Sequence, residues 1–235
     1  MSSAPSTARA RARAELTAEI KATARQQLAE VGAPALSLRA VARDLGMVSS
    51  AVYRYFASRD ALLTALIVDA FDAVGQTAER AIDDVPDDVL VRWRAVAGAI
   101  RRWALANPHD YGLIYGSPVP GYQAPQDTVI PAARVSLVML GIVADGVTSG
   151  QIDVTPTASV PRPVHADLAR LRKLAAPGVP DELLARALLV WTGLFGTISY
   201  ELFGHLYRVI DDYDAFFDHQ VRRAGAYLVS GARQR

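Results

Sequence analysis

Apolar residues recur at steps of three and four along most of the chain, which is the period of an amphipathic α-helix. Segments with strand-like alternation are scarce. The first apolar stripe consists of Leu16, Ile20, Ala24, Leu28 and Val31. Gly32 and Pro34 follow this stripe and predict its end. The pattern predicts an all-α protein of about nine or ten helices, without an internal repeat.

Further helices are predicted wherever the same period returns. They lie at 38–45, 50–56, 59–82, 88–107, 128–150, 164–176, 181–209 and 214–230. A short helix is also expected from Pro108 to Gly116. Prolines and glycines cluster over 117–127 and 151–163, which predicts loops there. Ser58 precedes the helix over 59–82 and is a suitable N-cap for it.

The two short helices have the spacing of a helix-turn-helix between Ser37 and Phe56. Gly46 ends the first helix at a position that commonly needs a positive φ angle. Ala42 is small enough for the second helix to approach closely. The shared apolar wedge consists of Val41, Leu45, Met47 and Val52. This arrangement is typical of proteins that insert the second helix into the major groove of DNA.

The candidate DNA contacts lie on and around the second short helix. Small hydroxyl side chains at its start allow a close approach to bases and phosphates, and no acid occurs between Gly46 and Arg59. The predicted contacts are Ser37, Arg39, Ser49, Ser50, Ala51, Tyr53, Arg54, Tyr55 and Arg59. We expect Phe56 to belong to the core, whereas Tyr53 can combine partial burial with a DNA contact.

Charge changes this picture only slightly. The 235 residues carry a net charge of +1, but residues 1–60 hold nine basic and five acidic side chains. A basic N-terminal quarter fits a polyanionic partner such as double-stranded DNA. We interpret 1–14, with Arg9, Arg11 and Arg13, as a flexible basic arm. It either enters an adjacent minor groove or is a nonspecific basic tail.

The segment over 15–65 resembles the tetracycline-repressor (TetR) family of transcriptional regulators. The matching residues are Leu38-Arg-Ala-Val-Ala, Leu45-Gly46, Ser49, Ala51-Val-Tyr-Arg-Tyr-Phe56 and Ser58-Arg-Asp-Ala-Leu-Leu63. Arg59 stands where the family usually has lysine, and either residue can bind phosphate. The resemblance implies a helix-turn-helix domain over 15–62 and a helical effector-binding and dimerisation domain over 63–235. It also implies a homodimer, formed through the helices 181–209 and 214–230, on a palindromic operator.

The C-terminal part suggests where a small-molecule effector would bind. Trp191-Thr-Gly193 resembles a TetR subgroup named for a Trp-His-Gly motif, although Thr192 departs from it. Pockets between helices are commonly lined by aromatic residues and a few polar groups. The candidate effector-binding residues are Trp103, Tyr111, Tyr115, Tyr122, Trp191, Phe195, Tyr200 and His205, with His109 and Phe203 nearby. The alternative is that most of these aromatic residues form ordinary core.

Several other classes of protein find little support. Motifs for nucleotide binding or nucleophilic catalysis are missing, so we expect neither an enzyme nor a cofactor. Glu201 and His205 are four residues apart on a predicted helix, but no third metal ligand is evident. The chain has no cysteine, its first fifteen residues lack an apolar segment, and its longest uncharged apolar stretch has 14 residues. We therefore expect a cytoplasmic protein without a membrane span. A helical ligand-binding or scaffold protein, with a helix-turn-helix that no longer reads DNA, is the alternative function.

Overall fold

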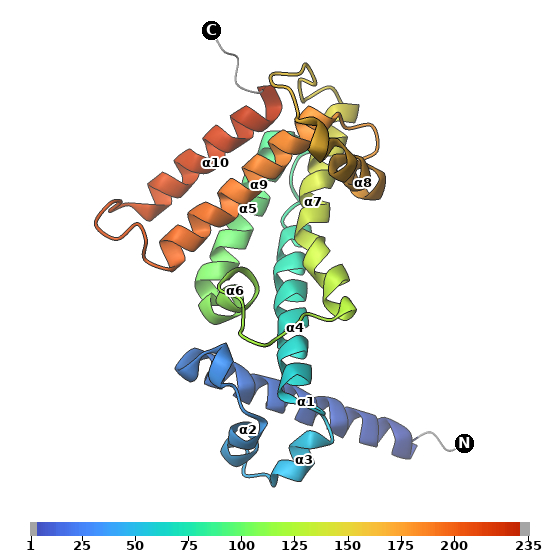
Figure 1. The fold of residues 1–235 in the computed structure, drawn as a ribbon, viewed down its shortest axis with the longest axis vertical. Helices are drawn as coiled ribbons and strands as arrows, with labels where there is room; N and C mark the ends of the chain where they lie inside the picture. The colour runs from blue at the N-terminus through green and yellow to red at the C-terminus, as the bar shows by residue number, and fades with distance from the viewer. Residues whose placement is uncertain (1–3, 231–235) are drawn as a thin grey trace. The chain divides into compact units, whose positions relative to one another are not determined.

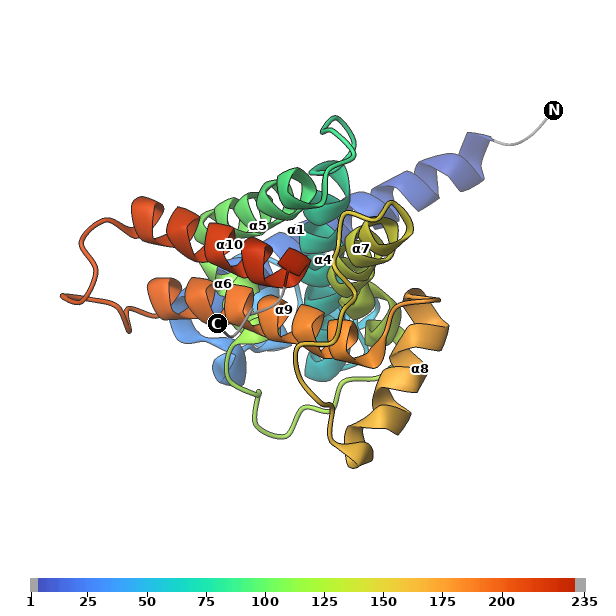
Figure 2. The ribbon, with the colours of Figure 1, turned by 90° about the horizontal axis from the view of Figure 1, so that it is seen from above.

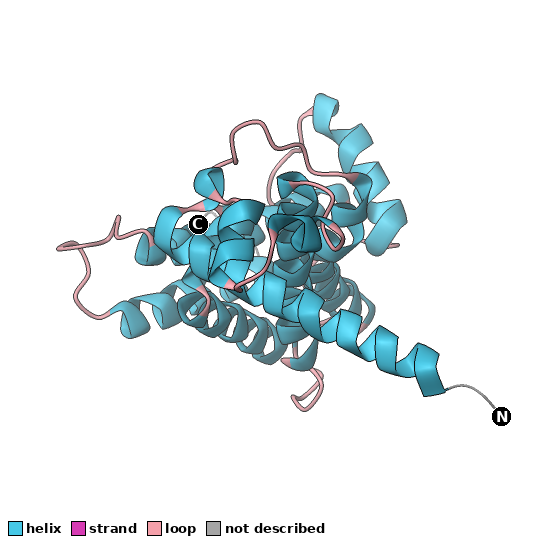
Figure 3. Cartoon of the chain, turned by 90° about the horizontal axis from the view of Figure 1, so that it is seen from below, coloured by secondary structure: helices cyan, strands magenta, loops and turns pink. Residues whose placement is uncertain are grey.

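The computed structural model describes the backbone of residues 4–230, and the elements in this range are helices joined by loops (Figures 1 and 3). The α-helices are α1 (Ala4–Val31), α2 (Leu38–Asp44), α3 (Ser49–Tyr53), α4 (Arg59–Arg80), α5 (Val89–Ala106), α6 (Pro108–Tyr115), α7 (Val129–Thr148), α8 (His165–Ala175), α9 (Asp181–Leu202) and α10 (Tyr213–Ser230). Three short 3-10 helices are Ala33–Ala35, Gln126–Thr128 and Arg162–Val164. The predicted all-α class is confirmed.

The chain divides into two compact units. The first comprises Met1–Phe71 and His109–Val129, and the second comprises Asp72–Pro108 and Ile130–Arg235. This division differs from the predicted domains 15–62 and 63–235, because most of α6 and the loop after it belong to the helix-turn-helix unit. Leu113, Ile114 and Val119 pack against the core of that unit, which explains the difference.

The first unit begins with a longer helix than the sequence predicted. Residues 4–14, expected as a flexible arm, form the first turns of α1. Alanine and arginine are good helix formers, and they dominate this segment. Ile20, Ala24 and Leu28, on the predicted stripe, are buried in the core of the unit. A basic segment over 4–14 is therefore presented as a helix.

In the second unit, α9 and α10 lie side by side and α5 packs against both (Figures 1 and 2). Trp93 on α5 is fully buried, and its indole Nε1 donates a hydrogen bond of 2.7 Å to the carbonyl oxygen of Val221. Gly225 allows this close packing, since a Cβ there would lie 2.7 Å from the Trp93 ring. The buried indole thus joins α5 to α10 by both packing and hydrogen bonding.

A buried arginine fixes the loop before α8 to the same bundle. The Arg186 side chain is fully shielded from solvent, and its NH2 atom lies 2.6 Å from the Glu182 carboxylate. Its NH1 donates to the backbone oxygens of Leu228, at 3.2 Å, and Asp153, at 3.4 Å. A buried charge needs such partners, because leaving it unpaired in the interior is costly.

The helix α9 ends earlier than predicted, at Leu202 rather than near Val209. Gly204 adopts a φ of 76°, and its N–H donates to the carbonyl of Glu201 while the N–H of His205 donates to that of Tyr200. This pair of hydrogen bonds around a left-handed residue is a common helix C-cap. Glu201 and His205 therefore do not share a helix face, contrary to the prediction.

Three helical segments are long and apolar enough to cross a membrane, judged by length and composition alone. They are Arg59–Arg80, Gln126–Thr148 and Asp181–Leu202. The sequence predicted instead that the last of these is buried within protein. In the structure, α9 contributes Leu183, Leu184, Val190, Leu194 and Ile198 to the core.

Candidate nucleic-acid interface and C-terminal pockets

The turn between α2 and α3 is built around Gly46, which has a φ of 65°. The N–H of Gly46 donates to the carbonyl of Arg43, and the N–H of Met47 donates to that of Ala42 at 2.8 Å. Glycine adopts this left-handed conformation without the steric cost that a Cβ imposes. The predicted role of Gly46 is confirmed.

Beneath the turn, the predicted apolar wedge forms the core of the helix-turn-helix. Val41, Ala42 and Val52 are fully or almost fully buried, and Phe56 is 7% exposed. Leu45 and Met47 pack partly buried against the same core. The assignment of Phe56 to the core is confirmed. Because these side chains hold α3 against α2, the opposite face of α3 is left to the solvent.

Four of the nine candidate DNA contacts are exposed, and they lie on α2, on α3 and at the C-cap of α3. Tyr53 is 46% exposed, and Arg39, Ser50 and Arg54 are also exposed. The remaining candidates, Ser37, Ser49, Ala51, Tyr55 and Arg59, are half-buried. We name the group Arg39, Ser50, Tyr53 and Arg54 the recognition surface.

Sequence reasoning missed Val48, the N-cap residue of α3. It is 71% exposed, although it is apolar and belongs to the turn of a packed motif. An exposed aliphatic side chain beside a recognition helix can contact the methyl group of thymine. The sequence gives no signal for this exposure, because Val48 is an apolar residue that lies next to Met47 of the apolar wedge.

Arg59, predicted to hold a phosphate, makes several contacts within the protein. Its NH2 donates to the carbonyl of Ala33 at 2.7 Å and its Nε to that of Leu36 at 3.2 Å. Its NH1 lies 3.1 Å from the Asp60 carboxylate. These bonds fasten the start of α4 to the turn after α1. A phosphate contact by Arg59 remains a prediction.

One residue of the predicted basic arm, Arg13, contacts the motif. The guanidinium of Arg13 lies 5.0 Å from the centre of the Tyr55 ring, which is the geometry of a cation–π interaction. Its NH2 lies 3.5 Å from the backbone oxygen of Arg54. Arg13 thus sits beside the end of α3, where it adds positive charge next to the recognition surface.

Ion pairs connect α1 to α4 within the same unit. Lys21 and Arg25 both lie 2.7 Å from the Asp69 carboxylate, and Arg25 is 3.6 Å from Asp110. Partial burial raises the pKa of Asp110, and Arg25 partly opposes that shift. These ion pairs hold α1 against α4 and α6 within the unit that contains the helix-turn-helix.

The predicted aromatic effector residues are not gathered in one place. Tyr111 is fully buried in the first unit, its ring centre 5.1 Å from that of Tyr115. Burial raises the pKa of Tyr115 above its ordinary value. The hydroxyl of Tyr122 hydrogen bonds to that of Thr64 at 2.9 Å. These three tyrosines belong to the unit that contains the helix-turn-helix, whereas Trp103 belongs to the second unit.

The other predicted group is spread along α9 and its C-terminal end. The rings of Trp191 and Phe195 are 5.8 Å apart at nearly a right angle. The rings of Tyr200 and His205 are 5.2 Å apart, and both residues are exposed. Trp191 is the member of the predicted set that lines the apolar pocket described next.

That pocket has a volume of about 180 Å³ and lies among α7, α8, α9 and α10. It is lined by Ser136, Met139, Leu140, Val143, Leu171, Ala187, Leu188, Val190, Trp191 and Leu228. We name it the α7–α10 pocket. The indole Nε1 of Trp191 is buried and has no hydrogen-bond partner.

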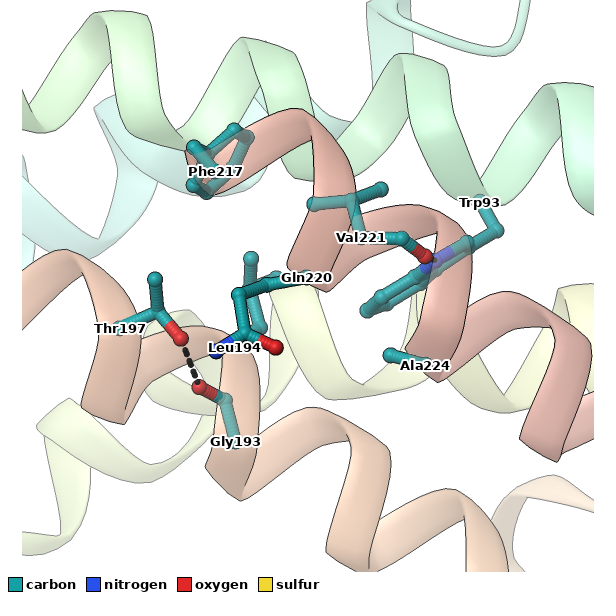
Figure 4. Close-up of a pocket in the computed structure, with 8 residues that line it drawn as sticks. All are labelled: Trp93, Gly193, Leu194, Thr197, Phe217, Gln220, Val221 and Ala224. Carbon is teal, nitrogen blue, oxygen red and sulfur yellow. Dashed lines mark hydrogen bonds between the residues drawn. The ribbon is translucent and has the colours of Figure 1, made fainter. Parts of the chain in front are cut away.

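A second hollow, of about 210 Å³, lies along the groove between α9 and α10 (Figure 4). Gly193, Leu194 and Thr197 form its α9 side, and the Thr197 hydroxyl donates to the carbonyl of Gly193 at 2.9 Å. A Cβ placed on Gly193 or Gly196 would meet nothing within 4 Å. Nearby, Leu189 is 59% and Tyr200 56% exposed. This face of α9 is smooth, apolar and open.

The carboxylate of Glu201, considered above as a metal ligand, is held by an arginine instead. Arg101 donates to its two oxygens from Nε and NH2 at 2.8 and 2.6 Å. This bidentate pair raises the pKa of Arg101, and Asp214 adds to the shift. Among the described residues, no group of three or more His, Cys, Asp or Glu side chains could hold a metal ion.

Two family models match the chain. The model for bacterial regulatory proteins of the tetR family matches residues 20–66, and that for the tetracyclin repressor-like C-terminal domain matches residues 93–224. The matched ranges cover the helix-turn-helix and most of the second unit. The tetR-family match agrees with the resemblance found in the sequence.

Known proteins support the same relationship. The HTH-type transcriptional regulator Rv1816 of Mycobacterium tuberculosis is 43% identical over 225 residues, covering 92% of this chain and 94% of that protein. The crystal structure of regulatory protein SCO4313 aligns with a TM-score of 0.74 at 35% identity, covering 91% of this chain and 97% of that one. A protein from Rhodococcus sp. RHA1 shares the fold with a TM-score of 0.70 at 24% identity, with coverages of 91% and 95%. The chain therefore belongs to the TetR family of helix-turn-helix transcriptional regulators, which are not enzymes.

Proposed function

We propose that the protein binds a palindromic operator as a homodimer and that a small-molecule effector modulates this binding, most simply as a repressor. The observation that carries the DNA contact is the recognition surface: Arg39, Ser50, Tyr53 and Arg54 are exposed together, with no acid between Gly46 and Arg59. Arginine and hydroxyl side chains are the usual partners of phosphates and base edges. Such binding takes place in the cytoplasm, where bacterial DNA is found.

The proposed dimer uses α9 and α10. The open face around Gly193 and Gly196 supports this assignment, because two helices approach closely where side chains are absent. The exposed large residues Leu189, Tyr200 and Phe203 would be covered by the partner. In such a dimer the two recognition surfaces would address half-sites roughly 34–36 Å apart, one turn of the DNA helix.

Effector control finds support in α7, which both lines the α7–α10 pocket and holds α4. Arg134 of α7 lies 2.6 Å from Asp72 and from Glu79, both on α4. A ligand changes operator binding only if it binds the two states of the protein with different affinity. Displacement of α7 by a bound molecule is a route to that difference, since α4 begins directly after the helix-turn-helix.

The test is a gel shift with DNA from the region beside the protein's own gene. Tyr53→Ala is expected to weaken operator binding about tenfold, because it removes a hydrogen bond to a charged phosphate or to a base edge. Tyr53→Phe separates the hydroxyl from the ring. Tyr227→Phe, on α10, is the matched control for a lost hydroxyl and should bind as the wild type does.

Two outcomes would count against the proposal. Absence of salt-sensitive binding to any inverted repeat in that region would favour the alternative, a helical ligand-binding or scaffold protein. Unchanged affinity of both Tyr53 variants would remove Tyr53 from the recognition surface, and the arginines of that surface would then be examined in the same assay.

A further inference from the structure

The second unit contains an open groove of about 510 Å³ between the C-terminal end of α4 and α5. Arg80 of α4 and Arg94 and Arg102 of α5 line this groove, and all three residues are exposed. None of the residues that line it is acidic. A groove lined by charges of one sign concentrates ions of the opposite sign, because the fields of the charges add. We name it the α4–α5 groove.

The other two arginines of α5 already have acidic partners. Arg92 binds two carboxylates at 3.0 Å, and Arg101 binds two at 2.6 Å. In the part of the chain that the structure describes, Arg94 and Arg102 form no ion pair. The two arginines of α5 that face the groove therefore keep their donors for a ligand.

Arg80 follows an acid in the sequence, but that acid has a different partner. Arg134 donates hydrogen bonds of 2.8 and 2.6 Å to the two oxygens of Glu79. These bonds are the main cause of the lowered pKa of Glu79, and the charge of Arg80 makes only the smallest contribution. Because another arginine holds both carboxylate oxygens, the guanidinium of Arg80 is left for the groove.

Small side chains form the floor of the groove. Ala99 is buried, and Thr77, Ala81 and Ala95 are half-buried. The Thr77 hydroxyl donates to the carbonyl of Ala73 at 2.8 Å, so the donors that remain for a ligand are those of the arginines. Short side chains between two helices leave depth, which lets a ligand of several atoms lie below the guanidinium groups.

Gly98 allows Arg102 to lie along α5. A Cβ on Gly98 would be 3.2 Å from the NH1 atom of Arg102. The Arg102 guanidinium therefore lies one turn closer to Arg94 than its own Cα does, in the direction that long side chains usually take on a helix. The two Cα atoms are eight residues apart, or about 12 Å along a helix. Charges spread over this length suit a ligand with more than one anionic group.

We propose that the α4–α5 groove binds a small organic anion that carries at least two phosphoryl or carboxyl groups. Arginine suits both groups, because its planar guanidinium donates paired hydrogen bonds to two oxygens. The inference goes beyond the proposed function and does not rest on it, since all the lining residues belong to the second unit and binding needs no DNA.

Three probe anions test the proposal by calorimetry on the full chain without DNA. Pyrophosphate carries two phosphoryl groups, tricarballylate carries three carboxyl groups, and orthophosphate carries a single phosphoryl group. We expect one pyrophosphate or tricarballylate to bind per chain, and the tighter of the two identifies the anionic group that the groove prefers. Orthophosphate should bind at least about tenfold more weakly. Affinity should fall as salt rises, because the arginines are exposed.

Variants locate the binding. Arg80→Gln and Arg102→Gln should each weaken binding of the preferred probe about fivefold, a loss typical of an exposed charge pair. Arg162→Gln is the matched control, because Arg162 is an exposed arginine of the same unit that lies outside the groove. Ala95→Glu places a negative charge on the floor and should abolish binding, with the circular-dichroism melt reporting whether the variant folds.

The proposal is overturned if neither polyanion binds at about 1 mM, if orthophosphate binds as tightly as pyrophosphate, or if Arg80→Gln and Arg102→Gln bind as Arg162→Gln does. A loss of operator affinity in Arg102→Gln as large as its loss of probe affinity would assign the groove to DNA phosphates and would also overturn it. The operator gel shift tests the proposed function separately, because the probes are measured without DNA.

Discussion

Two glycines perform the same local task at two distant points of the chain. Gly46 and Gly204 both have a positive φ, and each is followed by a residue whose N–H reaches back to the preceding helix. The first sets the angle between α2 and α3, and the second stops α9 before its apolar pattern ends. In both places a side chain would strain the backbone rather than clash with neighbours, because a Cβ would meet nothing within 4 Å.

Gly46→Ala is expected to lower the free energy of unfolding by about 1–2 kcal/mol, the cost of a left-handed residue that carries a Cβ. Urea unfolding followed by circular dichroism measures it. Gly141→Ala is the control, because Gly141 lies inside α7 with equally open space around its Cβ. Helix propensity makes that variant neutral or slightly more stable. Equal destabilisation of both variants would contradict the account.

Residue roles were predictable where the local sequence determines them. Gly46 as a turn, Phe56 as core and Ser58 as an N-cap could be inferred from a few neighbours, and the Ser58 hydroxyl does accept from the N–H of Ala61 at 3.1 Å. The carbonyl partners of Arg59 could not be predicted. They lie 23 to 26 residues away, and their direction depends on how the chain turns after α1.

At the scale of elements, Arg134 acts as a clamp between α7 and α4. Its side chain crosses α4 at Gly75, where a Cβ would lie 2.7 Å from the Cβ of Arg134. The Arg134 guanidinium donates hydrogen bonds to Glu79, which lowers the pKa of that carboxyl. The clamp therefore contributes a pH-dependent part of the stability of the second unit.

The sign of that dependence follows from the lowered pKa. The ionised Glu79 carboxylate binds Arg134 in the folded state, so the stabilisation is complete above the ordinary pKa of 4.5 and is lost as the pH falls through the lower folded-state value. Glu79→Gln should flatten the loss of stability between about pH 6 and about pH 3, by less than about 1 kcal/mol because the pair is partly exposed.

Urea unfolding at several pH values measures this effect. Glu30→Gln, on α1, is the control because it removes a carboxylate that belongs to the other unit. If the free energy of unfolding of Glu79→Gln depended on pH as that of the wild type does, the ion pair between Arg134 and Glu79 would be too well solvated to contribute to stability.

Helix existence was predicted well, and helix ends less so. The period of apolar residues identifies α4, α5, α7 and α10 within two residues at each end. It placed the end of α9 near Val209 because apolar residues continue beyond Leu202. It placed the start of α1 after residue 14 because 4–14 lack an apolar stripe. Caps and alanine content decide these ends, and both are weaker signals than periodicity.

At the scale of the whole molecule, the proposed dimer gives a direct prediction. Gly193→Arg should convert the dimer to a folded monomer, since the new side chain projects from an open face of α9 and disturbs no packing within the protomer. Sedimentation velocity measures the mass, and the circular-dichroism melt tests folding. Gly141→Arg, on α7, has the same room for its Cβ and should remain dimeric.

The reverse result would relocate the interface. A dimer that survives Gly193→Arg and is lost in Gly141→Arg would place the contact on α7, where Ile130 is 80% and Leu137 44% exposed. A wild-type protein that is monomeric at micromolar concentrations would contradict the proposed assembly altogether.

The fold class and the regulatory role were predictable at this scale, because the short helix-turn-helix motif and the residues after it are typical of one family of helical regulators. The candidate effector-binding residues stay a prediction, and the structure does not bring them together in one cavity. Aromatic residues were grouped by nearness in sequence, but Tyr111 and Tyr115 pack in the unit of the helix-turn-helix and Trp191 lines a pocket of the other unit. Which aromatic side chains share a cavity depends on helix packing over long separations, and a single sequence does not report it.

The most direct test of the central claim is the mass and salt dependence of the complex with the operator. Sedimentation with labelled DNA should show two protein chains on a palindrome, and far weaker binding to a single half-site. Affinity should fall steeply as salt rises, and Arg39→Ala should reduce the slope of that dependence by about 1, whereas Arg94→Ala on α5 should not. Salt-independent binding, or equal affinity for the palindrome and for scrambled DNA, would contradict the account.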